Sequence, residues 1–121
     1  MNVFDASALL AYLQGEPGSD VVRRQLESGG ACGAANWAEV AQKVRAAGAD
    51  WALARSLLLS FDLVVEPVIE ADAEAAAAMW RKGTGLSLGD RLCLALAARS
   101  GAMAWSADLQ WRGVPGVTLI R

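Results

Sequence analysis

The stretch that decides the fold stands at the start of the chain and reads Asn2-Val3-Phe4-Asp5-Ala6-Ser7. Its apolar residues show no polar alternation, which predicts a short strand buried on both faces. A helical pattern follows at once, over residues 6–13. Asp5 therefore stands where a strand ends and a helix begins. Open α/β sheets bind ligands at this edge, so further acids at the same edge would form a site.

Short apolar segments alternate with helical patterns along the rest of the chain. Further strands are expected at about 31–35, 63–66, 102–105 and 117–120, and further helices at about 19–26, 36–47, 50–61, 70–82 and 88–99. The expected N-caps are Ser19 or Asp20, Asn36, Asp50 and Ser87. Strands separated by helices are joined by right-handed crossovers, so the pattern predicts an α/β fold with a mostly parallel sheet.

One helix stands out by its composition. Residues 92–98 are apolar on every side, and Arg91 and Arg99 mark the only polar edge. A helix of this kind is expected at the centre of the molecule, with those two arginines toward water.

The composition indicates one globular domain over residues 1–121. Apolar residues make up 55% of the chain and charged residues 20%, which excludes a disordered protein. The chain has no apolar run of about 18 residues for a membrane span and no signal-peptide pattern at its start. The expectation is a soluble, cytoplasmic protein without a membrane partner. Cys32 and Cys93 lack a CxxC partner and are expected to be buried thiols.

The chain contains no histidine. This removes the usual general acid and base, and the Ser-His and Cys-His dyads. Hydrolytic chemistry would then rest on carboxylates, together with a metal ion. The net charge of −2 gives no overall attraction for nucleic acid, so such a ligand would need a local basic patch and a cation in the site.

Four acids fall where expected strands end or the next helices begin. Asp5 follows the first strand and Asp108 the fourth. Glu39 is expected in the first turn of the helix after the second strand, and Asp90 in the first turn of the helix leading to the fourth. Because parallel strands end at one edge of their sheet, these four side chains can converge.

Each acid also has a purely structural explanation. Asp5 could cap its helix, Asp108 could be a turn residue, and Glu39 could pair with Lys43. Two segments resemble capping boxes: Asn36-Trp37-Ala38-Glu39 and Ser87-Leu88-Gly89-Asp90. Structural caps would be scattered over both edges of the sheet, whereas these acids share one edge. That shared edge favours a cation site.

Close carboxylates repel each other, and without a cation one of them takes up a proton. Mg²⁺ and Mn²⁺ prefer oxygen ligands, and Mg²⁺ keeps several of its waters, which the remaining acids can hold. A metal-bound water is a stronger acid and can become a nucleophile, and the ion offsets charge on a phosphate oxygen. Such a site would hydrolyse a phosphodiester without histidine.

Four segments resemble the four motifs of PIN domains, in the same order along the chain. They are Val3-Phe4-Asp5-Ala6-Ser7-Ala8-Leu9, Asn36-Trp37-Ala38-Glu39-Val40, Leu88-Gly89-Asp90-Arg91-Leu92 and Ser106-Ala107-Asp108-Leu109-Gln110-Trp111. Ala6 and Ser106 stand where many members have Thr. The small size is similar to that of the VapC toxins of VapBC toxin–antitoxin pairs.

The resemblance implies a three-layer α/β/α sandwich around a mostly parallel sheet, and a Mg²⁺- or Mn²⁺-dependent endoribonuclease. By motif position the catalytic acids would be Asp5, Glu39, Asp90 and Asp108, of which Asp5, Asp90 and Asp108 would bind the metal. Ser7 and Ser106 would be hydroxyls that support ligands or waters. The resemblance also implies an RNA substrate, a homodimer and a VapB-like antitoxin that blocks the site.

The basic residues expected to contact RNA are Arg81, Lys82 and Arg91, followed by Arg112. The segment from Arg81 to Gly85 runs toward Asp90, so its cations and free amides could meet phosphates. The alternative is that these are charges at a helix end on a solvated surface. The chain also has five tryptophans, of which one or two exposed ones would suit a partner surface.

Other functions were weighed against these residues. A non-toxin PIN nuclease would use the same chemistry. A receiver-like signalling domain needs an acid pair after the first strand and a late lysine, but Asp5 stands alone and no lysine follows Lys82. An Asp-x-Asp phosphatase fails because Ser7 takes the place of the second acid. A non-catalytic binding module is disfavoured because all four acids are present.

Overall fold

The first strand forms the centre of the sheet because both of its faces are covered. In the computed structural model, which describes residues 1–121, Val3 and Phe4 are fully buried and belong to two different apolar clusters. The five strands are β1 (Asn2–Phe4), β2 (Gly30–Gly33), β3 (Leu63–Glu66), β4 (Met103–Ser106) and β5 (Val117–Leu119). All pairings are parallel, in the order β3-β2-β1-β4-β5. The expected parallel sheet, with the first strand beside the fourth, is confirmed.

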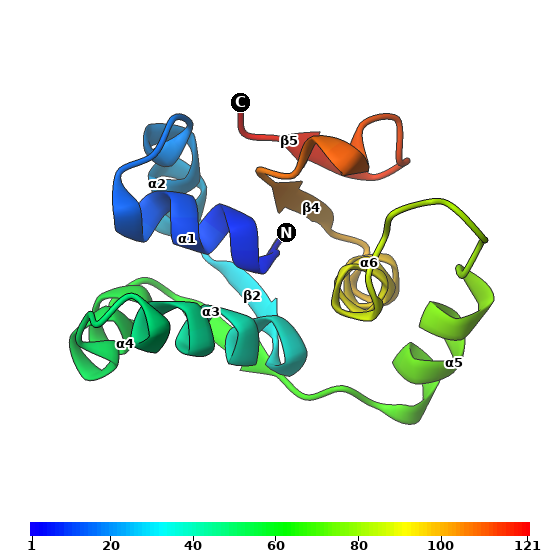
Figure 1. The fold of residues 1–121 in the computed structure, drawn as a ribbon, viewed down its shortest axis with the longest axis horizontal. Coiled ribbons are helices and arrows are strands. Elements are labelled where there is room, and N and C mark those ends of the chain that lie inside the picture. The colour runs from blue at the N-terminus through cyan, green and yellow to red at the C-terminus, as the bar shows by residue number, and fades with distance from the viewer.

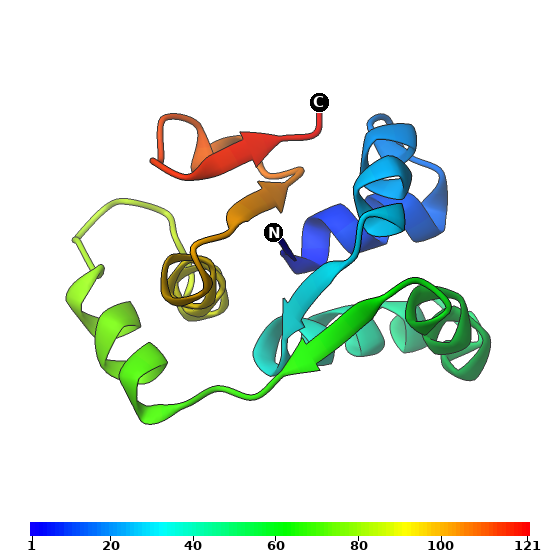
Figure 2. The same ribbon diagram turned by 180° about the vertical axis from the view of Figure 1, so that it is seen from behind.

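Helices cover both faces of this sheet, which confirms the three-layer α/β/α architecture (Figures 1 and 2). One face carries α1 (Ala6–Gln14), α2 (Ser19–Glu27), α3 (Ala34–Ala46) and α4 (Trp51–Leu59). The other carries α5 (Glu70–Ala78) and α6 (Leu88–Ser100), the latter seen end-on in both views. A short 3-10 turn, η1 (Leu109–Trp111), precedes β5. No helix is both long and apolar enough to cross a membrane.

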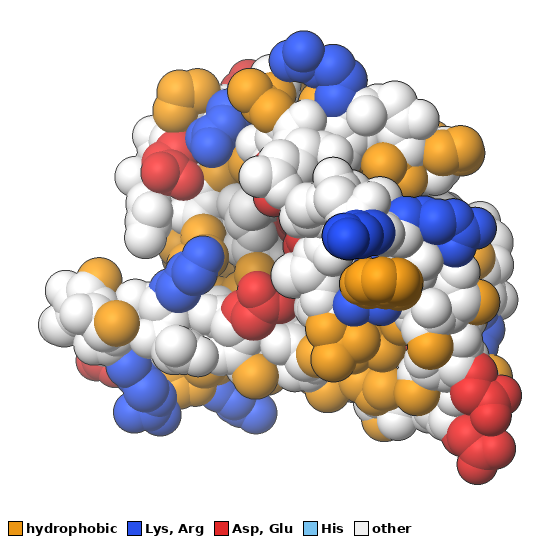
Figure 3. Space-filling model, turned by 45° about the vertical axis from the view of Figure 1, so that its right-hand side comes forward, with side chains coloured by type: hydrophobic (Ala, Val, Ile, Leu, Met, Phe, Trp, Pro, Cys, Tyr) orange, Lys and Arg blue, Asp and Glu red, His pale blue; other side chains and the backbone are white.

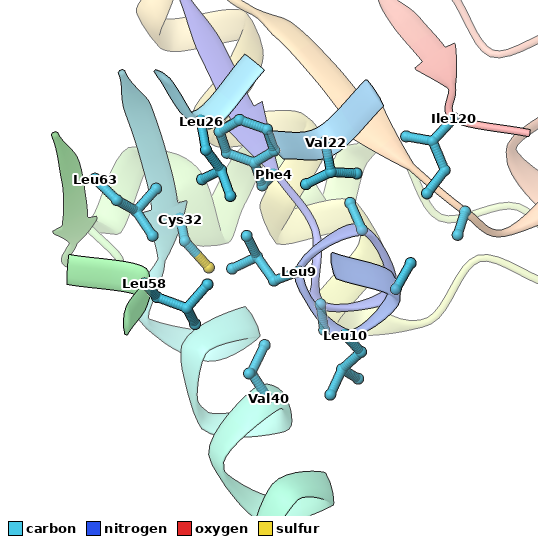
Figure 4. Packing of buried hydrophobic residues seen from close by; sticks show 14 of the residues in the cluster. Phe4, Leu9, Leu10, Val22, Leu26, Cys32, Val40, Leu58, Leu63 and Ile120 are labelled. Carbon is cyan, nitrogen blue, oxygen red and sulfur yellow. The ribbon is translucent and has the colours of Figure 1, made fainter. Parts of the chain in front are cut away.

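The larger apolar cluster fills the space between the sheet and the first four helices. Phe4 from β1 and Cys32 from β2 meet Leu9 of α1 and Leu58 of α4 there (Figure 4). The smaller cluster, on the α6 face, contains Val3, Cys93 and the fully buried Trp111. Both cysteines are free and buried, as expected. This packing fixes the ends of β1 and β4, which carry the acids.

The boundary between β2 and α3 was predicted wrongly. The strand was expected to run to residue 35 with Asn36 as the helix N-cap, but β2 ends at Gly33, which is itself the N-cap. Ala34 and Ala35 instead form the first helical residues, because alanine is the strongest helix former and a poor strand former. Asn36 therefore lies inside the first turn of α3, and Glu39 lies one turn further on rather than in the first turn.

Two other helix ends differ from expectation. The N-cap of α2 is Gly18, with φ 92°, instead of Ser19 or Asp20. A Cβ atom on Gly18 would lie 2.7 Å from the Ile120 carbonyl oxygen, so the close approach of the C-terminal segment requires glycine. The helix expected over 70–82 ends at Ala78, where Arg81 Nη1 donates to the carbonyl oxygens of Ala78 and Trp80. That side chain thereby satisfies carbonyls left free by the helix end.

The expected water-facing edge of α6 is bonded to α5 through both of its arginines. Arg99 donates from Nε to Asp72 Oδ1 at 2.8 Å and from Nη2 to Asp72 Oδ2 at 3.0 Å. The guanidinium holds the pKa of the buried Asp72 carboxyl below its usual range, chiefly through these hydrogen bonds. Arg91 donates from Nη1 to the Ala76 carbonyl at 2.9 Å. Both arginines thus join α6 to α5, and Arg99 remains exposed to water as expected.

Candidate metal-binding and active site

Asp5 is buried at the point where β1 ends, with only 3% of its surface exposed. Its Oδ1 accepts the backbone N–H of Ala8 at 2.8 Å, so it is also the N-cap of α1. Ser106 Oγ donates to Oδ2 at 2.6 Å, and Ser7 Oγ lies 2.8 and 2.9 Å from the two carboxylate oxygens. The carboxylate is therefore held in one orientation at the carboxyl edge of the sheet.

The two serines join Asp5 to the loop after β4. Ser7 Oγ accepts the backbone N–H of Ala107 at 2.9 Å, and Ser106 Oγ accepts the N–H of Asp108 at 3.0 Å. Because each hydroxyl accepts a bond from the backbone, its single proton is free to point at Asp5. This chain of bonds connects Asp5 on β1 with Asp108 beyond β4, although they are far apart in sequence.

Burial raises the pKa of the Asp5 carboxyl from 3.8 to about 6. The loss of hydration is the largest cause, and the negative charge of Asp90 adds to it. Hydrogen bonds from Ser106, Ala8 and Ser7 work in the opposite direction and lower the pKa. The carboxylate is thus a buried charge that lacks a cation partner among the side chains around it.

Asp90 and Asp108 are each held by the start of a helical segment. Asp90 forms a capping box with Ser87: Ser87 N donates to Asp90 Oδ2 at 2.9 Å, and Asp90 N donates to Ser87 Oγ at 3.1 Å. Asp108 caps η1 by accepting the N–H of Gln110 at 2.9 Å. The structural explanations for Asp5, Asp90 and Asp108 therefore hold, and these caps all lie at the same edge.

The Glu39 carboxylate is held by a hydrogen bond from the Asn36 side chain. Asn36 Nδ2 donates to Glu39 Oε1 at 3.1 Å and to the Gly89 carbonyl at 3.2 Å. No ion pair joins Glu39 to Lys43; the ion pairs are Arg23–Glu27, Arg99–Asp72 and Arg121–Glu16. A Cβ atom on Gly89 would lie 2.6 Å from Glu39 Oε1. Glu39 therefore occupies the space beside α6 that a larger residue at position 89 would fill.

The negative charges of Asp5, Asp90 and Glu39 all act on a buried thiol, that of Cys93. The pKa of the Cys93 thiol is raised well above its ordinary value, first by burial and then by charges that include those of Asp5, Asp90 and Glu39. The pKa of Cys32 is raised by burial, Asp5 and Glu39. The bonds of Ser106 to Asp5 and Asp108, and of Asn36 to Glu39 and to the backbone before Asp90, place all four predicted acids at the carboxyl edge of the sheet.

Asn36 is the one residue at this edge that sequence reasoning assigned to the wrong role. It is 2% exposed, and its Oδ1 is buried without a hydrogen-bond partner. An unpaired buried oxygen of this kind costs about 1–3 kcal/mol. The sequence predicts Asn36 as a helix cap because it is a polar residue three positions before Glu39. Its bond to the Gly89 carbonyl becomes visible only when α6 is packed against α3.

The donor set suits a hard divalent cation in its chemistry. Asp5, Glu39, Asp90 and Asp108 offer only oxygen ligands, which Mg²⁺ and Mn²⁺ prefer. In this structure, however, no three His, Cys, Asp or Glu side chains are grouped closely enough to hold an ion. Their oxygens are directed instead at hydroxyl and amide donors. The residues fit such an ion by type and by shared edge.

The surface around the site carries both signs of charge. Figure 3 shows acidic side chains set into a hollow on one face, with Lys and Arg side chains on the surface around it. Arg81, Lys82 and Arg112 are exposed, whereas Arg91 is half-buried and bonded to α5. Trp80 is 58% exposed, beside Arg81, and Trp111 is fully buried.

Comparison with known proteins agrees with the fold and the motif order. The family model described as "PIN domain" matches residues 3–117, and the chain belongs to the PIN domain family. PIN domains are nucleases, and they generally use divalent metals. The match covers the strands and helices that position all four acids.

Solved structures show the same fold. Nine chains of known structure match, among them one from a "Toxin-antitoxin complex from Klebsiella pneumoniae". It is 21% identical, has a TM-score of 0.79, and the alignment covers 100% of this chain and 98% of that one. No curated protein sequence matches the chain.

Proposed function

We propose that the protein is a metal-dependent endoribonuclease that hydrolyses RNA phosphodiester bonds. The observation that carries the proposal is the placement of Asp5, Glu39, Asp90 and Asp108 at one sheet edge, in a chain without histidine. The PIN family membership supports the nuclease class, the oxygen ligands at the edge support a divalent ion, and the RNA substrate is what the resemblance to VapC toxins implies.

The proposed roles follow from how each side chain is held. Asp5, Asp90 and Asp108 would bind Mg²⁺ or Mn²⁺, and Glu39 would hold a water beside it. When bound, such an ion supplies an acidified water and offsets charge on the phosphate. Ser7 and Ser106 keep Asp5 oriented by donating to its oxygens, and they accept backbone N–H groups that fix the loop carrying Asp108.

RNA would approach over the basic surface next to α6. Arg81 and Lys82 are exposed in the segment that leads to the Ser87 cap, and Arg112 is exposed beside η1. Arg91 is a weaker choice because Nη1 is bonded to Ala76. Replacing Arg81 and Lys82 with Ala should raise KM several-fold with little change in kcat, measured on a single-stranded RNA. Arg55→Ala, on the exposed side of α4, is the matched control; an equal effect there would remove Arg81 and Lys82 from the substrate surface.

In the cell we propose that the chain is the toxin of a type II toxin–antitoxin pair, acts as a single domain over residues 1–121, and forms a homodimer. Its partner would be a VapB-like antitoxin. The fold it shares with a chain of a toxin–antitoxin complex supports this assignment. A non-toxin PIN nuclease is the alternative, since it would use the same acids.

The direct test is cleavage of a single-stranded RNA with and without metal. The purified protein should cleave with Mg²⁺ or Mn²⁺, stop on addition of EDTA, and recover when excess metal is restored. Asp5→Asn keeps the size of the side chain but removes its charge, and it should lower the rate by about three orders of magnitude or more, since catalysis by a charged ligand is lost. Undiminished cleavage in EDTA, or by Asp5→Asn, would contradict the proposal.

A further inference from the structure

We propose that Asn36 and Gly89 form a clamp that sets the carboxylate of Glu39 at the acidic edge, with Asn36 as a positioning residue and Gly89 as the space that Glu39 needs. This inference rests on the proposed function for its purpose, but the clamp itself is a claim about geometry. It joins α3 to the first turn of α6, the two elements that carry Glu39 and Asp90.

The orientation of the Asn36 amide is determined by its neighbours. Both atoms that face Nδ2, Glu39 Oε1 at 3.1 Å and Gly89 O at 3.2 Å, are acceptors. Turning the amide over would place Oδ1 against two acceptors, so only the NH₂ group fits there. Oδ1 must then point the other way, where it is buried and has no partner. The unpaired oxygen is the consequence of satisfying Glu39 and Gly89 together.

A buried oxygen without a hydrogen-bond partner lowers stability, so the presence of Asn36 at this position calls for an explanation other than stability. Asn36 is not the helix cap, because Gly33 precedes the first turn and no side chain caps α3. Its two bonds instead connect a candidate catalytic acid with the backbone directly before Asp90. A shift of Asn36 would therefore move Glu39 relative to Asp90.

Gly89 contributes to the clamp because it has no side chain and leaves space for the Glu39 carboxylate. A Cβ atom there would lie 2.6 Å from Glu39 Oε1, 3.3 Å from Glu39 Cδ and 3.8 Å from Asn36 Nδ2. The backbone at Gly89 is helical with negative φ, so the position does not need glycine for its conformation. Alanine is a better helix former than glycine. Gly89→Ala should therefore keep α6 intact while it pushes Glu39 away from the edge.

The clamp is tested by Mn²⁺ binding, measured by calorimetry with the metal alone. Asn36→Ala and Gly89→Ala should each weaken Mn²⁺ binding about tenfold or more, as is typical when residues that orient a metal's surroundings are removed. Gly89→Ala should melt no lower than the wild type. Gln42→Ala, on the exposed side of α3, is the control and should bind Mn²⁺ unchanged.

A second set of variants shows whether both residues act through Glu39. In a Glu39→Gln background, Asn36→Ala and Gly89→Ala should cause no further loss of Mn²⁺ affinity, because the group they position is already gone. A loss of the same size in that background would overturn the proposal. Wild-type Mn²⁺ affinity in either single variant would also overturn it.

The hydrogen bond itself has a separate readout. In the wild type, NMR should show the Asn36 side-chain NH₂ exchanging with water at least tenfold more slowly than the exposed Gln42 NH₂. In Gly89→Ala this protection should fall. Equal exchange of the two amides in the wild type would overturn the clamp. Because this readout needs neither metal nor RNA, a protein that fails to cleave RNA but protects Asn36 would refute the proposed function alone.

Discussion

At the scale of single residues, Asp5 combines several hydrogen bonds with a raised pKa. It is fully engaged as a helix cap and as the acceptor of two serine hydroxyls, yet burial still raises its pKa to about 6. Three donors are therefore insufficient to replace the water it has lost. The ionised Asp5 carboxylate therefore stabilises the fold only weakly at neutral pH. A cation beside it would compensate for its lost hydration.

The first prediction concerns stability as a function of pH in the absence of metal. A carboxyl with a pKa of about 6 in the folded state and 3.8 when unfolded binds its proton more tightly in the folded state. Its contribution is complete below about pH 4 and is lost as pH rises through 6, a difference of roughly 3 kcal/mol. Chemical denaturation at pH 4.5 and at pH 7 should show about 2 kcal/mol of this fall in the wild type and not in Asp5→Asn.

The sign of this effect separates Asp5 from an ordinary structural acid. An ion-paired acid such as Asp72, whose pKa is lowered, contributes stability that is lost as pH falls. Asp5→Asn should accordingly be as stable as the wild type or more stable at pH 7 without metal. A variant that is clearly less stable than the wild type at pH 7 would show that the Asp5 charge is compensated in the fold.

At the scale of elements, the caps and the site are built from the same residues. The capping box of α6 holds Asp90, the cap of α1 is Asp5, and the cap of η1 is Asp108. Because helices begin where parallel strands end, the groups that satisfy helix N-termini are brought to one edge. A structural role as a helix cap therefore does not exclude the proposed role in the site for Asp5, Asp90 and Asp108.

The second prediction compares two caps of the same kind at different places. Ser87→Ala should cost about 1 kcal/mol of stability through the lost N-cap and should also loosen Asp90, lowering cleavage several-fold. Asp50→Ala removes the N-cap of α4, away from the acids, and should cost a similar amount of stability without affecting cleavage. Urea denaturation and RNA cleavage measure the two effects. Equal cleavage by both variants would show that the Ser87 cap does not matter for the site.

Much of the fold was accessible from the sequence because its signals are local. The strand at residues 63–66 and the caps Asp50 and Ser87 follow from β-branched runs and from side chains that bond within their own turn. The boundary near Ala34 and Ala35 was missed because alanine gives a weak signal where strand and helix meet. The early end of α5 depends on how the Arg81 side chain folds back, which no local pattern reports.

The sequence predicted four acids at one edge of the sheet with the hydroxyls of Ser7 and Ser106 beside them, but the contacts of Asn36 were missed. The positions of Asp5, Asp90 and Asp108 follow from strand ends and the parallel sheet. The role of Asn36 depends on Gly89, 53 residues further along the chain, and appears only when α3 and α6 are packed together. Long-range contacts of this kind leave no periodic signal in the sequence.

At the scale of the whole molecule, the sheet order decides which acids lie next to one another. The order β3-β2-β1-β4-β5 places β1 between the strands whose ends lead to Glu39 and Asp108. The helices α5 and α6 complete the other layer through Asp72–Arg99 and Arg91–Ala76. The acids thus lie along one edge of the sheet, and Figure 3 shows acidic and basic side chains on the same face of the molecule.

The third prediction concerns the action of the whole protein in a cell. If it is a toxin, induced expression of the chain alone should arrest growth, and co-expression of a cognate antitoxin should restore it. Expression of Asp5→Asn should leave growth unchanged at an equal protein level. Growth that continues despite proven RNA cleavage would favour a non-toxin nuclease.

The most direct test of the central claim is to locate Mn²⁺ in crystals of the protein by its anomalous diffraction. The account predicts a peak at the carboxyl edge of the sheet, among Asp5, Asp90 and Asp108 with Glu39 close by, and no such peak in Asp5→Asn. A peak elsewhere on the molecule, or an undiminished peak at this edge in Asp5→Asn, would contradict it.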